Sequence, residues 1–141
     1  MPFGTEKAAL MSKSESFIEA TGGSSTADHT ISGKNYKIHK FTANDDFVVS
    51  EVGSNDTVDI MLMAGGGSGG GAFNAGGGGA GGMVYKTEHT VTATTYAIVI
   101  GGGGATDIDD GNPGGNSTGF GMTAIGGSGG TTGPESQSAD A

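Results

Sequence analysis

Runs of glycine constrain the fold of this chain more than any other feature of its sequence. Residues 65–82 contain 12 glycines in 18 positions, residues 101–104 are all glycine, and residues 117–133 mix glycine with apolar residues. Glycine has no Cβ, so two glycine backbones can approach each other closely, but glycine also loses the most conformational freedom on folding. A folded glycine run must therefore recover that entropy through backbone hydrogen bonds to its neighbours.

The runs favour packed helices of the polyglycine II type. Such a helix is extended and left-handed, with about three residues per turn and no internal hydrogen bonds. Several of them packed side by side satisfy one another's N–H and C=O groups. Collagen is excluded because the runs lack the Gly-X-Y period and the chain has only 3 prolines. The glycines expected to build this region are Gly65, Gly66, Gly67, Gly76, Gly77, Gly78, Gly79, Gly101, Gly102, Gly103 and Gly104.

Flexible linkers are the alternative interpretation of the same runs. Linkers of that kind are usually Gly/Ser mixtures that lie between domains. The runs here contain almost no serine, and two of them begin where a predicted strand ends, at Gly65 and at Gly101. We therefore prefer packing, and replacing Gly77 and Gly78 with valine should then abolish folding.

Alternating apolar residues predict β-strands around the glycine blocks. The clearest alternation places Val58, Ile60 and Leu62 on one face of a strand. Residues 53–56 (Gly-Ser-Asn-Asp) predict a hairpin turn before that strand, and the last two predicted strands are expected to pair with each other. The predicted strands cover residues 36–41, 47–52, 57–64, 83–93 and 94–100.

The N-terminal region has a different character. Residues 1–20 are the only stretch with a helical pattern, and Leu10, Phe17 and Ile18 fall on one face of that short helix, as candidates for anchoring the chain to a neighbour. Residues 21–35 have the composition of a linker. The expected organisation is an extended or short-helical attachment arm (1–35), a small antiparallel β-sandwich-like domain with packed glycine segments (36–133) and a C-terminal tail (134–141).

Composition excludes several classes of function. The net charge is −9, with 15 acidic residues, 6 lysines and no arginine, which argues against binding of nucleic acid. No apolar run is long enough for membrane insertion. Leu, Ile, Val and Phe total only 23 of 141 residues, so the core is thin. Backbone hydrogen bonds or contacts with other chains must then hold the fold.

Few residues suggest chemistry. The histidines lack the tight spacing of a metal pair, and no nucleophile with a partnered base can be assembled, so we expect no enzymatic activity and no cofactor. The best candidate for a site is the acidic cluster of Asp107, Asp109 and Asp110, because calcium prefers oxygen ligands in loops. Its spacing does not match the EF-hand pattern. A solvated turn is the preferred interpretation of these residues.

Three methionines flank the first glycine block. Met61, Met63 and Met83 either pack over the glycine segments or form an adaptable contact surface. We prefer the first interpretation.

The order of these elements resembles a known family. The pattern is an aromatic-started strand, a short turn, the alternating strand TVDIMLMA, a glycine block, GGMVY, the strand end AIVI and a second glycine block. It is similar to the glycine-rich domain of phage tail-fibre and adhesin proteins, over residues 36–104 closely and 105–133 loosely. The resemblance implies sandwiches of polyglycine-type helices that serve as structural or receptor-contacting modules of a virion.

The resemblance and the composition together suggest a function. We expect a non-enzymatic virion protein, in a tail fibre or as a capsid decoration, that is attached to other virion proteins through its N-terminus. A homo-oligomer, with a trimer favoured, would supply the core that the chain lacks. Its outer surface could contact a host polysaccharide or receptor. The alternative is an ice- or polysaccharide-binding polyglycine bundle, for which Thr90, Thr92, Thr94 and Thr95 supply a fragment of a regular face.

Overall fold

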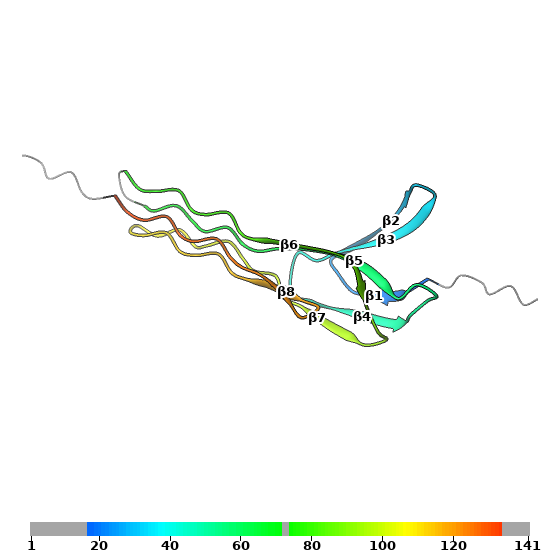
Figure 1. Cartoon of the computed structure of the whole chain (residues 1–141). Helices are drawn as coiled ribbons and strands as arrows, with labels where there is room; N and C mark the ends of the chain where they lie inside the picture. The colour runs from blue at the N-terminus through cyan, green and yellow to red at the C-terminus, as the bar shows by residue number, and fades with distance from the viewer. Residues whose placement is uncertain (1–16, 72–73, 134–141) are drawn as a thin grey trace, which may run out of the picture.

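The computed structural model describes residues 17–71 and 74–133, and these residues form β-strands and extended glycine runs (Figure 1). A β-domain lies at one end of the molecule, and a bundle of extended runs projects from it. The expected mainly-β fold is confirmed. None of the described residues lies in a helix, so this part of the chain contains no helix that could cross a membrane.

The described residues contain nine strands, all paired antiparallel in four small sheets. One sheet has the order β1-β4-β7, and the other three are the pairs β2–β3, β5–β6 and β8–β9. The predicted strands near residues 36–41, 47–52 and 57–64 are confirmed as β3, β4 and β5. The strands are β1 (Glu19–Thr21), β2 (Ser25–Ile31), β3 (Lys34–Lys40), β4 (Asp45–Glu51), β5 (Thr57–Met63), β6 (Met83–Thr90), β7 (Thr95–Ile98), β8 (Ser117–Gly119) and β9 (Met122–Ala124).

Two of the predicted strand pairings are wrong. Residues 53–56 do not form a hairpin turn, because β4 pairs with β1 and β7 whereas β5 pairs with β6. Strands β6 and β7 also belong to different sheets. The physical reason is burial, since β4 and β7 share one apolar cluster through Phe47 and Ile98, while β5 contributes Ile60 to another. A short connection between strands therefore marks a change of sheet here.

The N-terminal predictions need correction as well. Glu19–Thr21 is a strand rather than the end of a helix, and it pairs with β4 through Ala20 and Val49. The linker interpretation of residues 21–35 is wrong, because residues 25–31 form β2. Ser32 and Gly33 have φ values of 51° and 78°, as a type I′ turn requires at both central positions of a two-residue hairpin. The expected boundary at residue 35 falls inside this hairpin, and residues 1–16 and 134–141 lie outside the described residues.

The core consists of two small clusters that meet at Phe120. This residue occupies the turn between β8 and β9, and its ring packs against both clusters. It stacks on Tyr96 with ring centroids 4.8 Å apart, and it lies 5.7 Å from the rings of both Phe47 and His89. The buried members of the clusters are Phe47, Val49, Val91 and Ile98 in the first and Ile60, Leu62 and Ala124 in the second.

Candidate functional site

Five extended runs form the glycine bundle, the most distinctive feature of the molecule. They lie side by side and project away from the β-domain (Figure 1). Three runs continue directly from strands β5, β7 and β9, and two return toward the sheets. We number them runs 1 to 5, for residues 64–71, 75–82, 100–105, 111–116 and 125–133.

Run 1 donates hydrogen bonds to two neighbours at intervals of three residues. One series joins it to run 2, from the N–H groups of Ala64, Gly67 and Gly70 to the C=O groups of Gly82, Gly79 and Gly76, at 2.9, 2.8 and 3.1 Å. The series one residue later joins it to run 4 and to the turn before that run, from Gly65, Ser68 and Gly71 to Gly115, Asn112 and Asp109. A period of three is that of the polyglycine II helix. The packing interpretation of the glycine runs is confirmed, and the linker interpretation is wrong.

The remaining runs complete a bundle in which run 1 is bonded to all four others. Run 1 accepts from run 3 through Gly104 and from run 5 through Gly127 and Gly130. Run 5 in turn accepts from runs 2 and 4. The donors of these last bonds are Gly76, Gly79 and Gly82 in run 2 and Gly111 and Gly114 in run 4. The bundle is therefore held by backbone hydrogen bonds, in place of an apolar core.

Contact between backbones explains which positions require glycine. A Cβ added at Gly78 would lie 2.1 Å from the carbonyl oxygen of Gly67, and one at Gly114 would lie 2.1 Å from that of Gly65. A Cβ at Gly77 or Gly102 would meet nothing within 4 Å. The predicted structural glycines thus fall into two groups, those that face a neighbouring run and those that face outward.

Run 5 shows the same rule in its sequence. Ile125, Ser128 and Thr131 are exposed at every third position, and the positions between them include Gly126, Gly127, Gly129 and Gly130, which face other runs. A repeat of one outward-facing residue followed by two glycines is the sequence signature of a run that packs against other runs on two faces. The sequence itself contains this signal.

Two serines stabilise the bundle at points where runs meet. Ser117 is completely buried, and its hydroxyl donates to the Met63 carbonyl at 2.7 Å and accepts from the Gly101 N–H at 2.9 Å. Ser68 likewise donates to the Ala105 carbonyl and accepts from the Asn112 N–H. A serine hydroxyl can donate and accept at once. Each of these two serines therefore bonds a backbone carbonyl on one side and a backbone N–H on the other. No local sequence pattern indicates these roles.

The side chains of the acidic cluster make separate contacts. Among the described residues, no three His, Asp or Glu side chains group so as to hold a metal ion. Asp107 accepts a hydrogen bond from the adjacent Ile108 N–H, whereas Asp110 accepts from the N–H and the hydroxyl of Thr132. The Asp110 contacts fasten the start of run 4 to run 5 near the outer end of the bundle.

Two carboxylates have lowered pKa values because they accept backbone hydrogen bonds. The pKa of Asp110 is lowered from its ordinary value, mainly by the N–H of Thr132 and then by its hydroxyl. The pKa of Asp45 is lowered by the N–H of Gly23 and, to a smaller extent, by that of Asp46. Hydrogen bonds of this kind favour the charged form of a carboxylate.

These shifts predict a loss of stability in acid. A carboxylate with a depressed pKa in the folded state stabilises the fold above its unfolded pKa, and that contribution disappears as the pH falls through the folded pKa. The melting temperature should therefore decline below about pH 4. In the double variant Asp45→Asn/Asp110→Asn the decline should be shallower, measured by circular dichroism from pH 7 to pH 2.5. Asp109→Asn removes a neighbouring carboxylate and should leave the slope unchanged; an equal effect of both variants would contradict the assignment.

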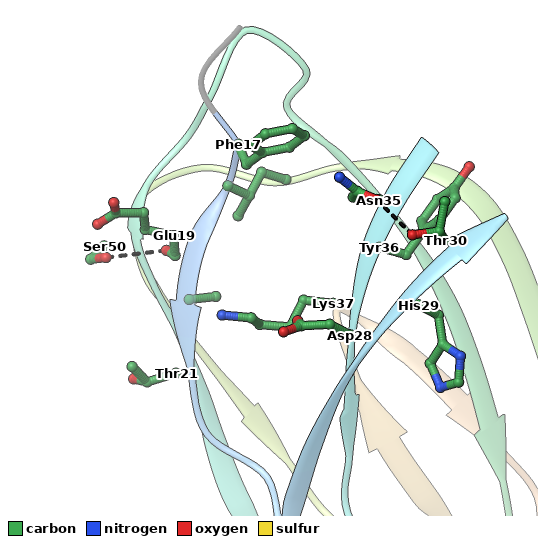
Figure 2. Close-up of a pocket in the computed structure, with 12 residues that line it drawn as sticks. Phe17, Glu19, Thr21, Asp28, His29, Thr30, Asn35, Tyr36, Lys37 and Ser50 are labelled. Atoms are coloured by element: carbon green, nitrogen blue, oxygen red, sulfur yellow. Dashed lines mark hydrogen bonds between the residues drawn. The ribbon is translucent and has the colours of Figure 1, made fainter. Parts of the chain in front are cut away.

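An open cleft of 760 Å³ separates β1 from the β2–β3 hairpin (Figure 2). Asp28 and Lys37 point into it, and the exposed Phe17 lies at its edge. Of the anchoring candidates, Ile18 packs partly buried against the first core cluster, so it does not share an exposed face with Phe17. Leu10 lies outside the described residues.

The methionines do not pack over the glycine runs. Met61, Met63 and Met83 are 61–62 % exposed, because they point outward from the β5–β6 sheet. The preferred interpretation of these residues is therefore wrong, and the alternative of a contact surface stays a prediction.

Comparisons with known proteins identify one family. A family model described as "Glycine-rich domain" matches residues 42–141, which include all the runs of the bundle. No curated protein and no solved structure gives a significant match to the chain. Because the match covers more than half of the sequence and includes the hydrogen-bonded runs, this chain belongs to the glycine-rich domain family.

Proposed function

We propose that the chain is a non-enzymatic structural component of a virion appendage, such as a phage tail fibre or a surface decoration. The observation that carries the proposal is the glycine bundle. Run 1 is hydrogen-bonded to four other runs through its backbone, which makes a stiff projection from few apolar residues. A stiff, thin projection suits a part that holds another protein or a contact surface away from a particle.

The surfaces of the β-domain agree with such a role. Phe17, which is 66 % exposed, lies beside the cleft at the start of the described residues, where an attached neighbour could cover it. The exposed methionines offer a further contact area. Other virion proteins and further copies of the chain are the proposed partners, and a host polysaccharide or receptor is the proposed outer contact.

The ice- or polysaccharide-binding alternative gains little from the arrangement. The threonines that suggested it lie at the end of β6, in the connection to β7 and at the start of β7, outside the glycine bundle. On run 5, Ser128 and Thr131 give one exposed row of hydroxyl groups. Binding of an extended lattice would need several parallel rows on one flat face.

The proposal is tested on particles rather than on the isolated chain. Virions purified from the source that carries this gene should contain the chain by mass spectrometry. Antibodies raised against the β-domain should label an appendage in electron micrographs. Recovery of the chain only from the soluble cell fraction, with unlabelled particles, would contradict the proposed location.

A further inference from the structure

The β2–β3 hairpin has an apolar face that no described residue buries. The pairing register places Ala27 opposite Ile38 and His29 opposite Tyr36, with Ile31 next on the same face. Ile31, Tyr36 and Ile38 are 57, 43 and 47 % exposed. An isolated two-stranded hairpin is marginally stable at best in water, so covering this face would stabilise it.

The two faces of the hairpin differ in character. Figure 2 shows Asp28 and Lys37 pointing toward β1, whereas Tyr36 and His29 lie on the opposite side of the hairpin. The side that borders the cleft is therefore polar and charged. The other side carries the exposed apolar residues, and we call it the hairpin face (Ala27, Ile31, Tyr36 and Ile38).

A second apolar surface lies on the β5–β6 sheet. Met61 pairs directly with Tyr85 and Met63 with Met83, so the four side chains form one continuous group, which we call the methionine patch. Each is 61–62 % exposed. Flexible, polarizable methionine side chains adapt to the shape of a partner, and apolar surfaces of this kind mark interaction sites.

Charge determines how these two surfaces can be covered. Lys34 and Lys40 lie on the same side of β3 as Tyr36 and Ile38, so they flank the hairpin face. Asp59 lies beside Met61 on the outer side of β5, and its carboxylate accepts the backbone N–H of Glu88, an exposed residue of β6. Two acidic residues therefore lie next to each other at one end of the methionine patch. Packing either surface against its own copy would bring like charges together. Packing one against the other brings opposite charges together, as interfaces between specific partners do.

We propose that the hairpin face of one copy of this chain packs against the methionine patch of a second copy, with Lys34 facing the carboxylates of Asp59 and Glu88. Lys34 lies at the free end of the hairpin, opposite Ile31. Each chain carries both surfaces, so the same contact can repeat from copy to copy, and the proposed oligomer is a reciprocal dimer or a closed ring. This interface deepens the proposed function, since it specifies how the oligomer of the appendage is assembled.

The full chain and three variants test the interface by light scattering after size exclusion. The wild-type chain should show the mass of two or three chains of 13.7 kDa each. Lys34→Glu should weaken association about tenfold or more, the range expected for a charge pair worth ~1.4 kcal/mol or more. Lys37→Glu makes the same charge change on the opposite face of the same hairpin and should leave the mass unchanged. Adding Glu88→Lys to Lys34→Glu should restore association.

Three results would overturn the inference. A monomeric wild-type chain would remove the interface altogether. Equal weakening by Lys34→Glu and Lys37→Glu would mean that the net charge of the chain, and not this contact, controls association. No rescue by Glu88→Lys would mean that the copies associate through another surface. Both exchanged lysines are exposed, so circular dichroism should show an unchanged fold. Antibody labelling of particles tests the virion role independently. A negative result for this interface would therefore leave the proposed virion role unaffected.

Discussion

The variant Gly78→Ala should lose most or all of its folded state, whereas Gly77→Ala, one residue away, should fold normally. A methyl group at Gly78 would lie 2.1 Å from the Gly67 carbonyl oxygen, well inside contact distance, so runs 1 and 2 would have to separate. Separation breaks the hydrogen bond from Gly67 to Gly79 and weakens the one from Gly79 to Ser128. Each buried group left unpaired costs about 1–3 kcal/mol, and native stability is only about 5–15 kcal/mol in total.

Gly77→Ala is the matched control because its Cβ would enter open space. Removing a glycine from an extended position that alanine can adopt restricts the unfolded chain and stabilises a protein by about 0.4–1 kcal/mol. Thermal and urea unfolding of both variants should therefore move in opposite directions. Equal melting temperatures would mean that run 2 is not packed on run 1. The sequence predicted loss of folding for valine at Gly77 and Gly78 together, and the structure assigns that loss to Gly78.

The strand positions were predictable from the sequence because their signal is local. In β5, Val58, Ile60 and Leu62 alternate with exposed residues, and the structure buries Ile60 and Leu62 as expected. The packing of the glycine runs was predictable for a similar reason, since a long run with almost no serine that follows a strand directly is atypical of a linker.

The strand pairings were not predictable because they depend on distant residues. Strand β4 has two partners, β1 and β7, that are far from it in the sequence, and no local pattern specifies either. The β2–β3 hairpin was missed because His29 stands between the two apolar residues of β2, Ala27 and Ile31, so no clear alternation of apolar and polar residues marks the strand. Its only local sign was Ser32-Gly33, a dipeptide that suits a type I′ turn.

The functional details of the bundle depend on the register between runs. Nothing in a run of consecutive glycines distinguishes Gly77 from Gly78, because the difference comes from the position of run 1 beside run 2. The same holds for Ser68, which looks like one of the few interruptions in a glycine block and in fact links runs 1, 3 and 4. Only in run 5 does the sequence itself reveal which positions face outward.

Phe120→Ala should destabilise the β-domain by about 3 kcal/mol, the usual cost of removing a phenylalanine ring from a packed site. The ring contacts Tyr96, Phe47 and His89, and it packs against both core clusters. Its backbone has φ 53°, a strained conformation for a bulky residue, which persists because the ring is held on several sides. Alanine keeps the backbone strain and loses the ring contacts.

The measurement is thermal unfolding followed by circular dichroism, and the expected decrease in melting temperature is roughly 10 °C for a domain of this size. Ile125→Ala is the control, because it removes an apolar side chain that is 68 % exposed and should change the melting temperature little. Phe120→Gly relieves the positive φ as well as removing the ring. If Phe120→Gly were as stable as the wild-type chain, backbone conformation rather than ring packing would dominate at this turn. The Phe120 ring at the β8–β9 turn would then not be needed to connect the two core clusters.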